Sequence, residues 1–418
     1  MEKPPVWIER GYLILFALLP WSFEYSFGAW NLNLPGEPLI ALLGLALGWQ
    51  IARQPTALSL ALTRNHLLKI SLVWICWMAV CAAVSTMPLV SWKYWVVETG
   101  HWWVFAAGLS LFPDIGRRGI TLFAVSMCGM VVYTLIHHAF YHFRADQALL
   151  APMPFFPENT LYGAVLALVL FLGAATGFQQ PGRFRKVLFG VLCCIGLFFS
   201  FSQAAWVSVL AAGAAGMAVY YREKWRIVAP GFVLLVLMLC FFRQPIQRAL
   251  ARDVSFQERL NRYSCALRMS ADRMWTGFGP GTFQFQYLPY QQPEQMTRIS
   301  IKQPIPGHTP DAYGRGGGAH SEYFQALADM GLPGLSLYVL LAFVVLVSGL
   351  RCVLREKTRA GQAFILLLTL GLMTFFLHGL LNNLLHDGRI AALVWTAAVA
   401  AGGGSASKVN GVDVAGHC

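Results

Sequence analysis

The sequence predicts an all-α integral membrane protein with about 12 transmembrane helices and one large extracytoplasmic helical loop. Of its 418 residues, 57% are hydrophobic and only 12% are charged, far from the averages for soluble domains. Apolar runs of about 20 residues, long enough to cross a bilayer, recur with short polar breaks. The expected order is transmembrane helices 1–9 in residues 1–242, the large loop in 243–329, helices 10–12 in 330–404 and a cytoplasmic tail in 405–418.

Each span is placed on an apolar run. The twelve expected spans are 11–27, 36–52, 67–86, 93–112, 119–141, 158–178, 187–201, 203–221, 227–242, 330–350, 361–382 and 389–404. As a single helix, residues 187–221 would be roughly 50 Å long, against a hydrocarbon core of about 30 Å. We therefore expect a break between Ser200 and Gln203, which makes this stretch a helical hairpin.

The distribution of Lys and Arg sets the orientation, because short cytoplasmic loops carry the positive charge. With the N-terminus inside, 18 basic residues fall on the cytoplasmic side and only Lys93, Arg144 and Arg389 fall in short outer loops. A single span over 187–221 would place two basic loops on opposite sides. The charge pattern therefore supports the hairpin. It also explains the net charge of +12 by membrane orientation instead of nucleic-acid binding.

The long outer segment, about 243–322, holds the other ten basic residues, and nine of them are arginines. Long translocated segments are exempt from the charge rule, so these arginines need another explanation. A guanidinium binds phosphate in a bidentate manner, whereas an ammonium is a point charge. An anionic ligand at the outer face is one interpretation, and solvated helix faces or lipid headgroup contacts are the other.

Two motifs lie in this segment. Helical spacing from Phe256 places Arg259 and Arg262 one turn apart, and the glycine-rich run GFGPG at 277–281 then ends the helix in a tight turn. Further on, the stretch GRGGGAHSEYFQALADMGLPG leads from glycines through His320 into an apolar helix. His320 is therefore expected near a helix start at the membrane surface.

These motifs resemble the O-antigen ligase and polymerase superfamily of membrane glycosyltransferases. The resemblance rests on SFSQAAW at 200–206, Glu258-Arg259 leading to GFGPGTF, AHSEYFQALADMGLPG at 319–334, and HGLLNN at 378–383. With the span count and the single outer loop, it covers nearly the whole chain. The block at 319–334 is the most specific of the four.

The resemblance implies a GT-C-like, multi-pass protein of the bacterial inner membrane with its active site on the periplasmic face and both termini in the cytoplasm. It also implies an inverting, metal-independent transfer of glycan from undecaprenyl pyrophosphate to a lipid or glycolipid acceptor, without a cofactor or nucleic acid. His320 resembles the essential histidine and Arg259 the pyrophosphate-binding arginine of the family. A neutral histidine can accept a proton from a hydroxyl, and an arginine can stabilise a departing pyrophosphate.

Five more residues are candidates for substrate binding. Arg262, Arg315 and Arg389 are possible anion ligands, each of which could equally be structural. Arg144 is carried over from the loop at 142–160, where Pro157-Glu158-Asn159 departs from the usual pattern of relatives. Glu322 could orient the His320 imidazole if the backbone between them is not yet helical.

Other ionisable groups have simpler explanations. His138 and His142, four apart beside His137, could suggest a metal, but no carboxylate or cysteine nearby completes a ligand set, so no metal site is expected. Glu98 and His101, three apart in an apolar span, are expected to be functional or to satisfy each other.

Three alternative functions remain open. A polymerase would extend the carrier-linked chain, and a protein O-oligosaccharyltransferase would use a protein acceptor; both share these motifs. A transporter of the lipid-linked glycan would be expected to show internal repeats and charges at the membrane midplane. The basic residues instead gather on one side, which favours an enzyme over a transporter or a structural scaffold.

Overall fold

The computed structural model describes residues 4–27, 30–177, 182–221, 253–297, 300, 317–402, 408–409 and 412–413. This part of the chain is mostly helical, as predicted. The span expected at 227–242 lies outside the described residues.

The N-terminal half forms a series of helices with one hairpin. Its elements are α1 (Val6–Leu18), the 3-10 turn η1 (Leu19–Trp21), β1 (Phe23–Phe27), β2 (Trp30–Leu34), α2 (Gly36–Arg53), α3 (Pro55–Arg64), α4 (His66–Ala83), α5 (Pro88–His101), the π-helical segment η2 (Trp102–Gly108), α6 (Leu109–Leu111), α7 (Pro113–Ala139), η3 (Ala145–Gln147), α8 (Asn159–Gly177), α9 (Arg183–Phe199) and α10 (Gln203–Tyr220). The strands pair in antiparallel register, with Phe23 opposite Leu34.

The C-terminal half contains the longest helix. Its elements are α13 (Val254–Asp272), α14 (Phe283–Gln286), the 3-10 turns η5 (Leu288–Tyr290) and η6 (Pro293–Gln295), α15 (Glu322–Arg355), α16 (Arg359–His378), α17 (Gly388–Gly402), and the short paired strands β3 (Lys408–Val409) and β4 (Val412–Asp413).

Polar side chains define several helix starts. Asn65 caps α4 by accepting from Leu67 N, Asp253 caps α13 by accepting from Ser255 N, and Thr358 caps α16 by accepting from Gly361 N. Ser202 caps α10 in the same way, after α9 has ended at Phe199. The break expected between Ser200 and Gln203 is therefore present.

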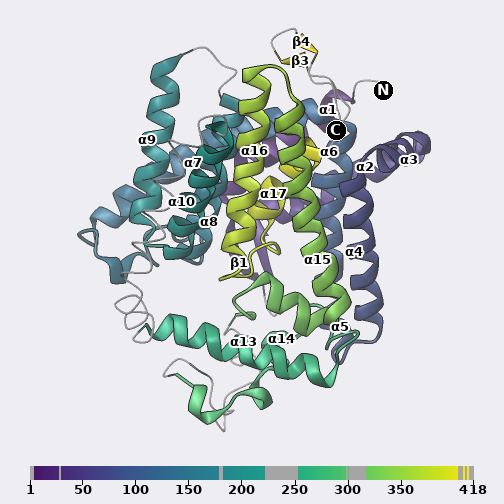
Figure 1. Ribbon diagram of the computed structural model, residues 1–418, viewed down its shortest axis with the longest axis vertical. Helices are drawn as coiled ribbons and strands as arrows, with labels where there is room; N and C mark the ends of the chain where they lie inside the picture. The colour runs from purple at the N-terminus through teal and green to yellow at the C-terminus, as the bar shows by residue number, and fades with distance from the viewer. Residues whose placement is uncertain are drawn as a thin grey trace.

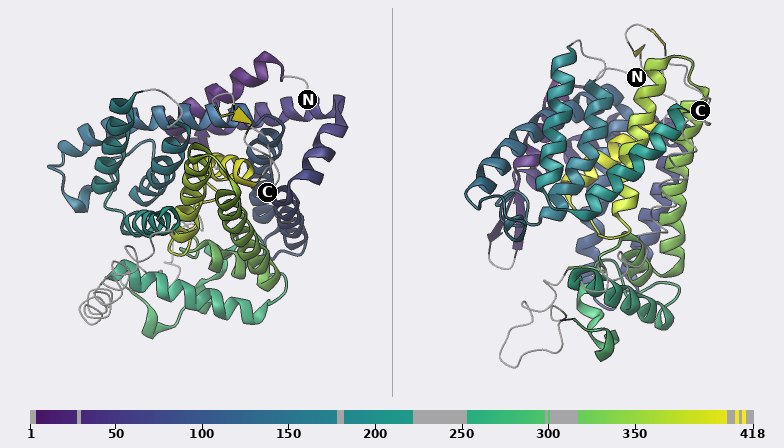
Figure 2. Two further views of the ribbon diagram at one scale, coloured as in Figure 1. Left: turned by 45° about the horizontal axis from the view of Figure 1, so that its top comes forward. Right: turned by 60° about the vertical axis from the view of Figure 1, so that its left-hand side comes forward.

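The spanning helices form a bundle in which α8 is largely buried and packs against α7, α9, α10, α16 and α17, while α15 packs against α4 and α16. In Figure 1, α13 and α14 lie across the lower end of this bundle, and β1 points toward the same end. The short strands β3 and β4 lie at the opposite end, as the right-hand view of Figure 2 also shows. The outer-loop elements are thus gathered at one end of the molecule.

Six described helices are long and apolar enough to cross a membrane: α4, α7, α8, α10, α15 and α16. A membrane-embedded, helical protein is therefore confirmed, whereas the count of twelve spans and the GT-C-like fold stay predictions. The expected first span, 11–27, is wrong in its second half, because β1 begins at Phe23. The hairpin also shows that the chain is not purely α-helical.

Helix α15 contains a kink that positions the glycine-rich turn. At Gly331 the backbone has a φ of 69°, which glycine tolerates, and the next residue, Leu332, donates from its N to Met274 O at 2.7 Å. Phe278 N donates to Ala328 O at 3.0 Å, and Gly279 N donates to Asp329 O at 2.9 Å. The GFGPG run is therefore docked onto the first part of α15.

Candidate active site

Three segments far apart in the sequence meet at the end of the bundle where α13 lies. They are α13, residues 317–322 before and at the start of α15, and residues 378–387 between α16 and α17, called the 378–387 turn below. The Tyr263 hydroxyl of α13 is 3.1 Å from His320 O and 2.7 Å from Leu380 O. Glu322 N donates to Gly379 O at 2.8 Å. Residues 258–263, 320–322 and 378–383, selected from the sequence as separate motifs, thus form one structure.

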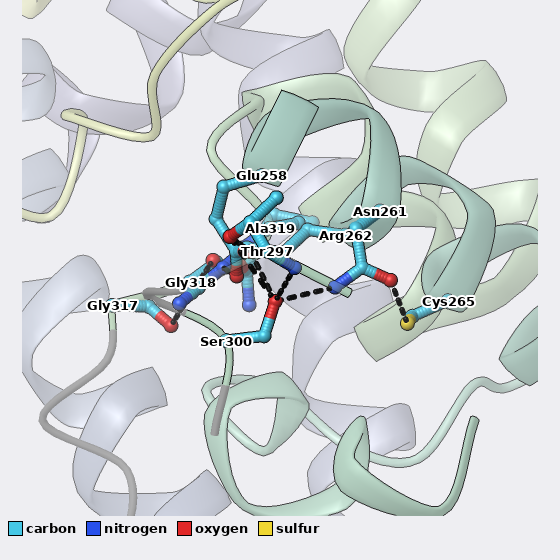
Figure 3. A network of polar contacts seen from close by, with 10 residues as sticks. Glu258, Asn261, Arg262, Cys265, Thr297, Ser300, Gly317, Gly318 and Ala319 are labelled. Atoms are coloured by element: carbon cyan, nitrogen blue, oxygen red, sulfur yellow. Dashed lines mark hydrogen bonds and ion pairs between the residues drawn. The ribbon is translucent and has the colours of Figure 1, made fainter. Parts of the chain in front are cut away.

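A buried ion pair holds the approach to His320. Arg262 Nε donates to Glu258 Oε1 at 3.1 Å, and both side chains are at most 4% exposed. The Arg262 NH1 group also donates to Gly317 O and Gly318 O, each at 2.8 Å. On the other side, Glu258 Oε2 accepts from Ser300 Oγ at 2.5 Å and from Thr297 Oγ1 at 2.8 Å (Figure 3). Arg262 is thus oriented by α13 and in turn fixes two backbone carbonyls just before His320.

Arg259 lies one turn earlier on α13 and faces the 378–387 turn. It is partly buried, and its Nε donates to Leu381 O at 3.1 Å. This one bond orients the guanidinium, whose terminal nitrogens are the groups suited to a bidentate contact with a phosphate. Its role as a pyrophosphate ligand stays a prediction.

His320 has an unusual backbone and a positive electrostatic environment. Its φ is 54°, in the left-handed region, so the residue sits in a turn directly before α15. Burial lowers the pKa of His320 to about 3, and the positive charges of Arg262 and Arg259 act in the same direction. The imidazole is therefore neutral at physiological pH and able to accept a proton.

Glu322 binds the 378–387 turn. Its Oε1 accepts hydrogen bonds from Leu384 N at 2.5 Å and Leu385 N at 2.6 Å. The Ser321 hydroxyl donates to Gly379 O at 3.1 Å and reinforces the junction. These contacts do not support the hypothesis that Glu322 orients the His320 imidazole, and its place in substrate binding stays a prediction.

The structure does not bring the remaining candidate arginines into one group. Arg389 is buried, bonded to Asp387 at 2.5 Å and to the carbonyls of Ser22 and Phe155. Arg144 is exposed and paired with Asp146 at 2.8 Å. Arg315 lies outside the described residues. Substrate contacts by these three arginines stay predictions.

The Glu98 carboxylate has a different partner from the one expected. Its Oε1 is 3.0 Å from Nδ1 of His386 in the 378–387 turn, whereas Nδ1 of His101 is buried with no hydrogen bond in the described part of the chain. Of the two expectations for Glu98 and His101, the mutual pairing is therefore wrong, and a functional role stays a prediction. Because His386 is 288 residues further along the chain, spacing within one helix gave no indication of this partner.

Asp329 is a further buried residue that sequence reasoning missed. Its carboxylate accepts from Gly281 N at 2.8 Å, Phe283 N at 3.0 Å and the Gln325 amide at 2.6 Å. It thereby fixes the end of the GFGPG run against α15. An acidic residue in an otherwise apolar helix was the available signal.

The histidines of the 137–142 region bond to backbone. His137 Nδ1 is 3.0 Å from Ala151 O, and His138 Nε2 is 3.0 Å from Arg144 O. In the described ranges, no group of three or more His, Cys, Asp or Glu side chains is arranged to hold a metal ion.

Comparison with known families gives one match. Residues 188–339, which include most of α9, all of α10 and α13, His320 and the first half of α15, match the family model described as O-antigen ligase. No curated protein matches the chain significantly. The matched range contains Arg259, Arg262 and His320, but it ends before the 378–387 turn, so the contacts of Arg259, Tyr263 and Glu322 connect this turn to the matched region.

Proposed function

We propose that this O-antigen ligase-like membrane protein transfers a glycan from undecaprenyl pyrophosphate to a hydroxyl of a lipid A-core type acceptor. The observation that carries the proposal is the convergence of Arg259, Tyr263 and His320 on the 378–387 turn. This arrangement puts an arginine and a neutral imidazole into one polar junction. They are the two groups that such a transfer requires.

In the proposed reaction, His320 takes the proton of the acceptor hydroxyl as its oxygen attacks the anomeric carbon of the donor. The bond between that carbon and the pyrophosphate oxygen breaks, and its electron pair leaves with the pyrophosphate. Attack from the opposite face inverts the anomeric centre. Arg259 stabilises the charge that develops on the leaving group, and Arg262 holds the chain that carries His320.

The low pKa of free His320 fits this sequence of events. A base with a pKa of about 3 is weak, but part of that depression comes from Arg262 and Arg259. A bound pyrophosphate would offset their charge and raise the pKa of the imidazole. The base would thus gain strength only when the donor is in place. The same charge matching supports a leaving group that needs no metal.

The cellular setting is part of the proposal. The basic loops favour cytoplasmic termini, and α13, α14 and the 378–387 turn gather at the opposite end of the bundle (Figure 1). The site would then face the periplasm from the inner membrane, where a carrier-linked glycan and a lipid acceptor are both within reach.

The direct test is transfer by the purified protein with carrier-linked glycan and candidate acceptor. We expect His320→Ala to lower kcat by about 10²–10⁴-fold and Arg259→Ala by about 10²–10³-fold. Arg268→Ala is the matched control, because this α13 arginine contacts Tyr290 O and Gln295 instead of the turn. A chelator should leave the wild-type rate unchanged. Full activity of folded His320→Ala, or loss of activity with the chelator, would refute the mechanism.

A cellular measurement separates ligase from polymerase. Without a ligase, polymerised glycan stays on the carrier and none reaches the acceptor. Without a polymerase, single repeat units are still attached. Deleting the gene and analysing the glycolipids by gel electrophoresis distinguishes the two outcomes.

A further inference from the structure

A second imidazole borders the candidate site from the other end of the 378–387 turn. Nδ1 of His386 is 3.0 Å from Glu98 Oε1, and the imidazole lies flat on Tyr94, with ring centroids 4.4 Å apart and an interplanar angle of 9°. The Glu98 side chain is 1% exposed, whereas that of His386 is 47% exposed. A buried carboxylate thus orients an accessible histidine.

This geometry selects one tautomer. A carboxylate can only accept from the neutral imidazole, so Nδ1 carries the hydrogen and Nε2 keeps its lone pair. One ring face lies on Tyr94 and Nδ1 faces Glu98, so the exposed part of the ring is the edge that carries Nε2 and the other face. The available nitrogen is therefore a hydrogen-bond acceptor for a donor outside the protein.

The His386 pair and the His320 site share one backbone segment. Glu322 N donates to Gly379 O, Arg259 Nε donates to Leu381 O, and the Glu322 carboxylate accepts from Leu384 N and Leu385 N. His386 is the next residue. A substrate that occupies the site around Arg259 and His320 therefore has the His386 pair on the adjoining part of the same turn.

Charge divides this region into two halves. Arg259 and Arg262 make the surroundings of His320 positive. Around His386, the charged and titratable groups are Tyr94, Glu98 and His101 on α5, Glu37 on α2, Glu322 on α15, and Asp387 with its partner Arg389. Because carboxylates predominate there, an anion is disfavoured and a neutral hydroxyl group is a better ligand.

We propose that His386, oriented by Glu98, is a binding residue for a carbohydrate hydroxyl of the glycan being transferred, separate from the pyrophosphate subsite at Arg259. The hydroxyl donates to Nε2, and no covalent step is involved. The class of ligand rests on the proposed function, since a glycan is the uncharged, hydroxyl-rich part of that donor. Within the described ranges the second oxygen of Glu98, Oε2, is buried without a partner, so the hydrogen bond of its side chain goes to His386.

The pair also gives the binding a defined pH dependence. Burial by itself would lower the pKa of His386, but the hydrogen bond and charge of Glu98, with Asp387 and Glu37, raise it above its usual value. Only the neutral imidazole can accept a hydrogen bond from a hydroxyl at Nε2, so this contact, and with it glycan binding, should strengthen as the pH rises through that pKa. In Glu98→Gln the raising charge is lost, so the same transition should move to lower pH.

The experiment measures binding instead of transfer, so that it does not depend on turnover. The probes are delipidated surface polysaccharide, released by mild acid from the source cells, and inorganic pyrophosphate, both added to the purified full-length protein. We expect His386→Asn to weaken polysaccharide binding by at least about tenfold and to leave pyrophosphate binding unchanged, whereas Arg259→Ala does the reverse. His142→Asn, which replaces an exposed histidine at the same end, is the control.

Each result of these binding measurements either supports or refutes the role of His386. Unchanged polysaccharide binding by His386→Asn would overturn the inference, even if transfer is confirmed. Selective loss of that binding would support it, even if transfer to lipid A-core fails. If His386→Asn loses both ligands because it misfolds, Glu98→Gln decides: a binding transition at lower pH supports the assignment, and an unshifted one refutes it.

Discussion

Charge around a single side chain determines what His320 can do. Arg262 is buried and bonded to Glu258 and to two backbone carbonyls, whereas Arg259 is only partly buried and donates from its Nε to Leu381 O. Both lower the pKa of His320, but of the two only Arg259 is partly exposed. We infer a division of labour in which Arg262 positions the chain and Arg259 meets the anion.

The first prediction concerns the His320 proton. In histidine-labelled protein, the NMR signal of His320 is the one that disappears in His320→Asn. This signal should titrate far below the usual histidine pKa of about 6.5. Saturating inorganic pyrophosphate should move the midpoint upward, because it offsets the arginine charges. A midpoint that does not respond to pyrophosphate would contradict the assignment of Arg259. Because the folded protein binds this proton more weakly than the unfolded chain, His320 also makes stability decrease as pH falls from about 6.5 toward about 3.

The second prediction concerns the buried ion pair. Arg262→Ala leaves the Glu258 carboxylate buried without its partner, which should cost about 3–5 kcal/mol of unfolding free energy. Arg144→Ala removes an exposed pair with Asp146 and should leave the unfolding midpoint unchanged. Thermal unfolding of both variants in the same detergent makes the comparison. Equal midpoints would mean that Arg262 does not hold the outer segment.

At the scale of elements, a short docking surface organises the outer loop. A Cβ at Gly331 would lie 2.5 Å from Met274 O, and a Cβ at Gly277 would lie 2.3 Å from the Asp329 carbonyl carbon. Both glycines also have positive φ, at 69° and 62°. The close approach of two backbones therefore explains these glycines, and it fixes where α13 sits relative to α15.

The third prediction follows from that approach. Gly331→Ala must strain the backbone and separate the two segments, so we expect loss of folded, active protein. Gly190→Ala is the matched control: this glycine lies inside α9, and a Cβ there meets nothing within 4 Å. Alanine is favoured there by about 1 kcal/mol of helix propensity. Comparable yields of the two variants in size-exclusion chromatography would argue against a structural role for the kink.

Sequence reasoning reached the elements with strong local signals. The break at Ser200 follows from helix length and loop charge, whereas the helix that carries Arg259 and the turn that carries His320 follow from helical spacing and glycine chemistry. It failed where the apolar pattern fits both a helix and a strand, and where two contacting residues lie far apart in the sequence. The apolar residues of β1 suit a span as well as a strand, and the Glu98 partner is a histidine from another helix connection. Long-range pairs of this kind leave no periodic trace in a single sequence.

For the whole molecule, the distribution of basic loops predicts the orientation in the membrane, which the fourth prediction tests. In a cysteine-free background, Glu294→Cys, near the outer helix α13, should react with a membrane-impermeant thiol reagent in intact spheroplasts. Lys357→Cys, between α15 and α16 at the opposite end, should react only after lysis. The reverse pattern would place the site in the cytoplasm and remove the proposed donor and acceptor from its reach.

The kink in α15 affects how far the candidate active site lies from the lipid bilayer. After Gly331 the helix continues to Arg355 for about 24 residues, roughly 36 Å, a little more than the hydrocarbon thickness of a bilayer. In the proposed orientation the kink falls near the headgroups of the outer leaflet, and His320 lies beyond it, just before the first turns of α15. Membrane thickness would then set how far a carrier pyrophosphate must rise to meet the imidazole. Bilayers of thicker lipids should slow the reaction without changing any side chain.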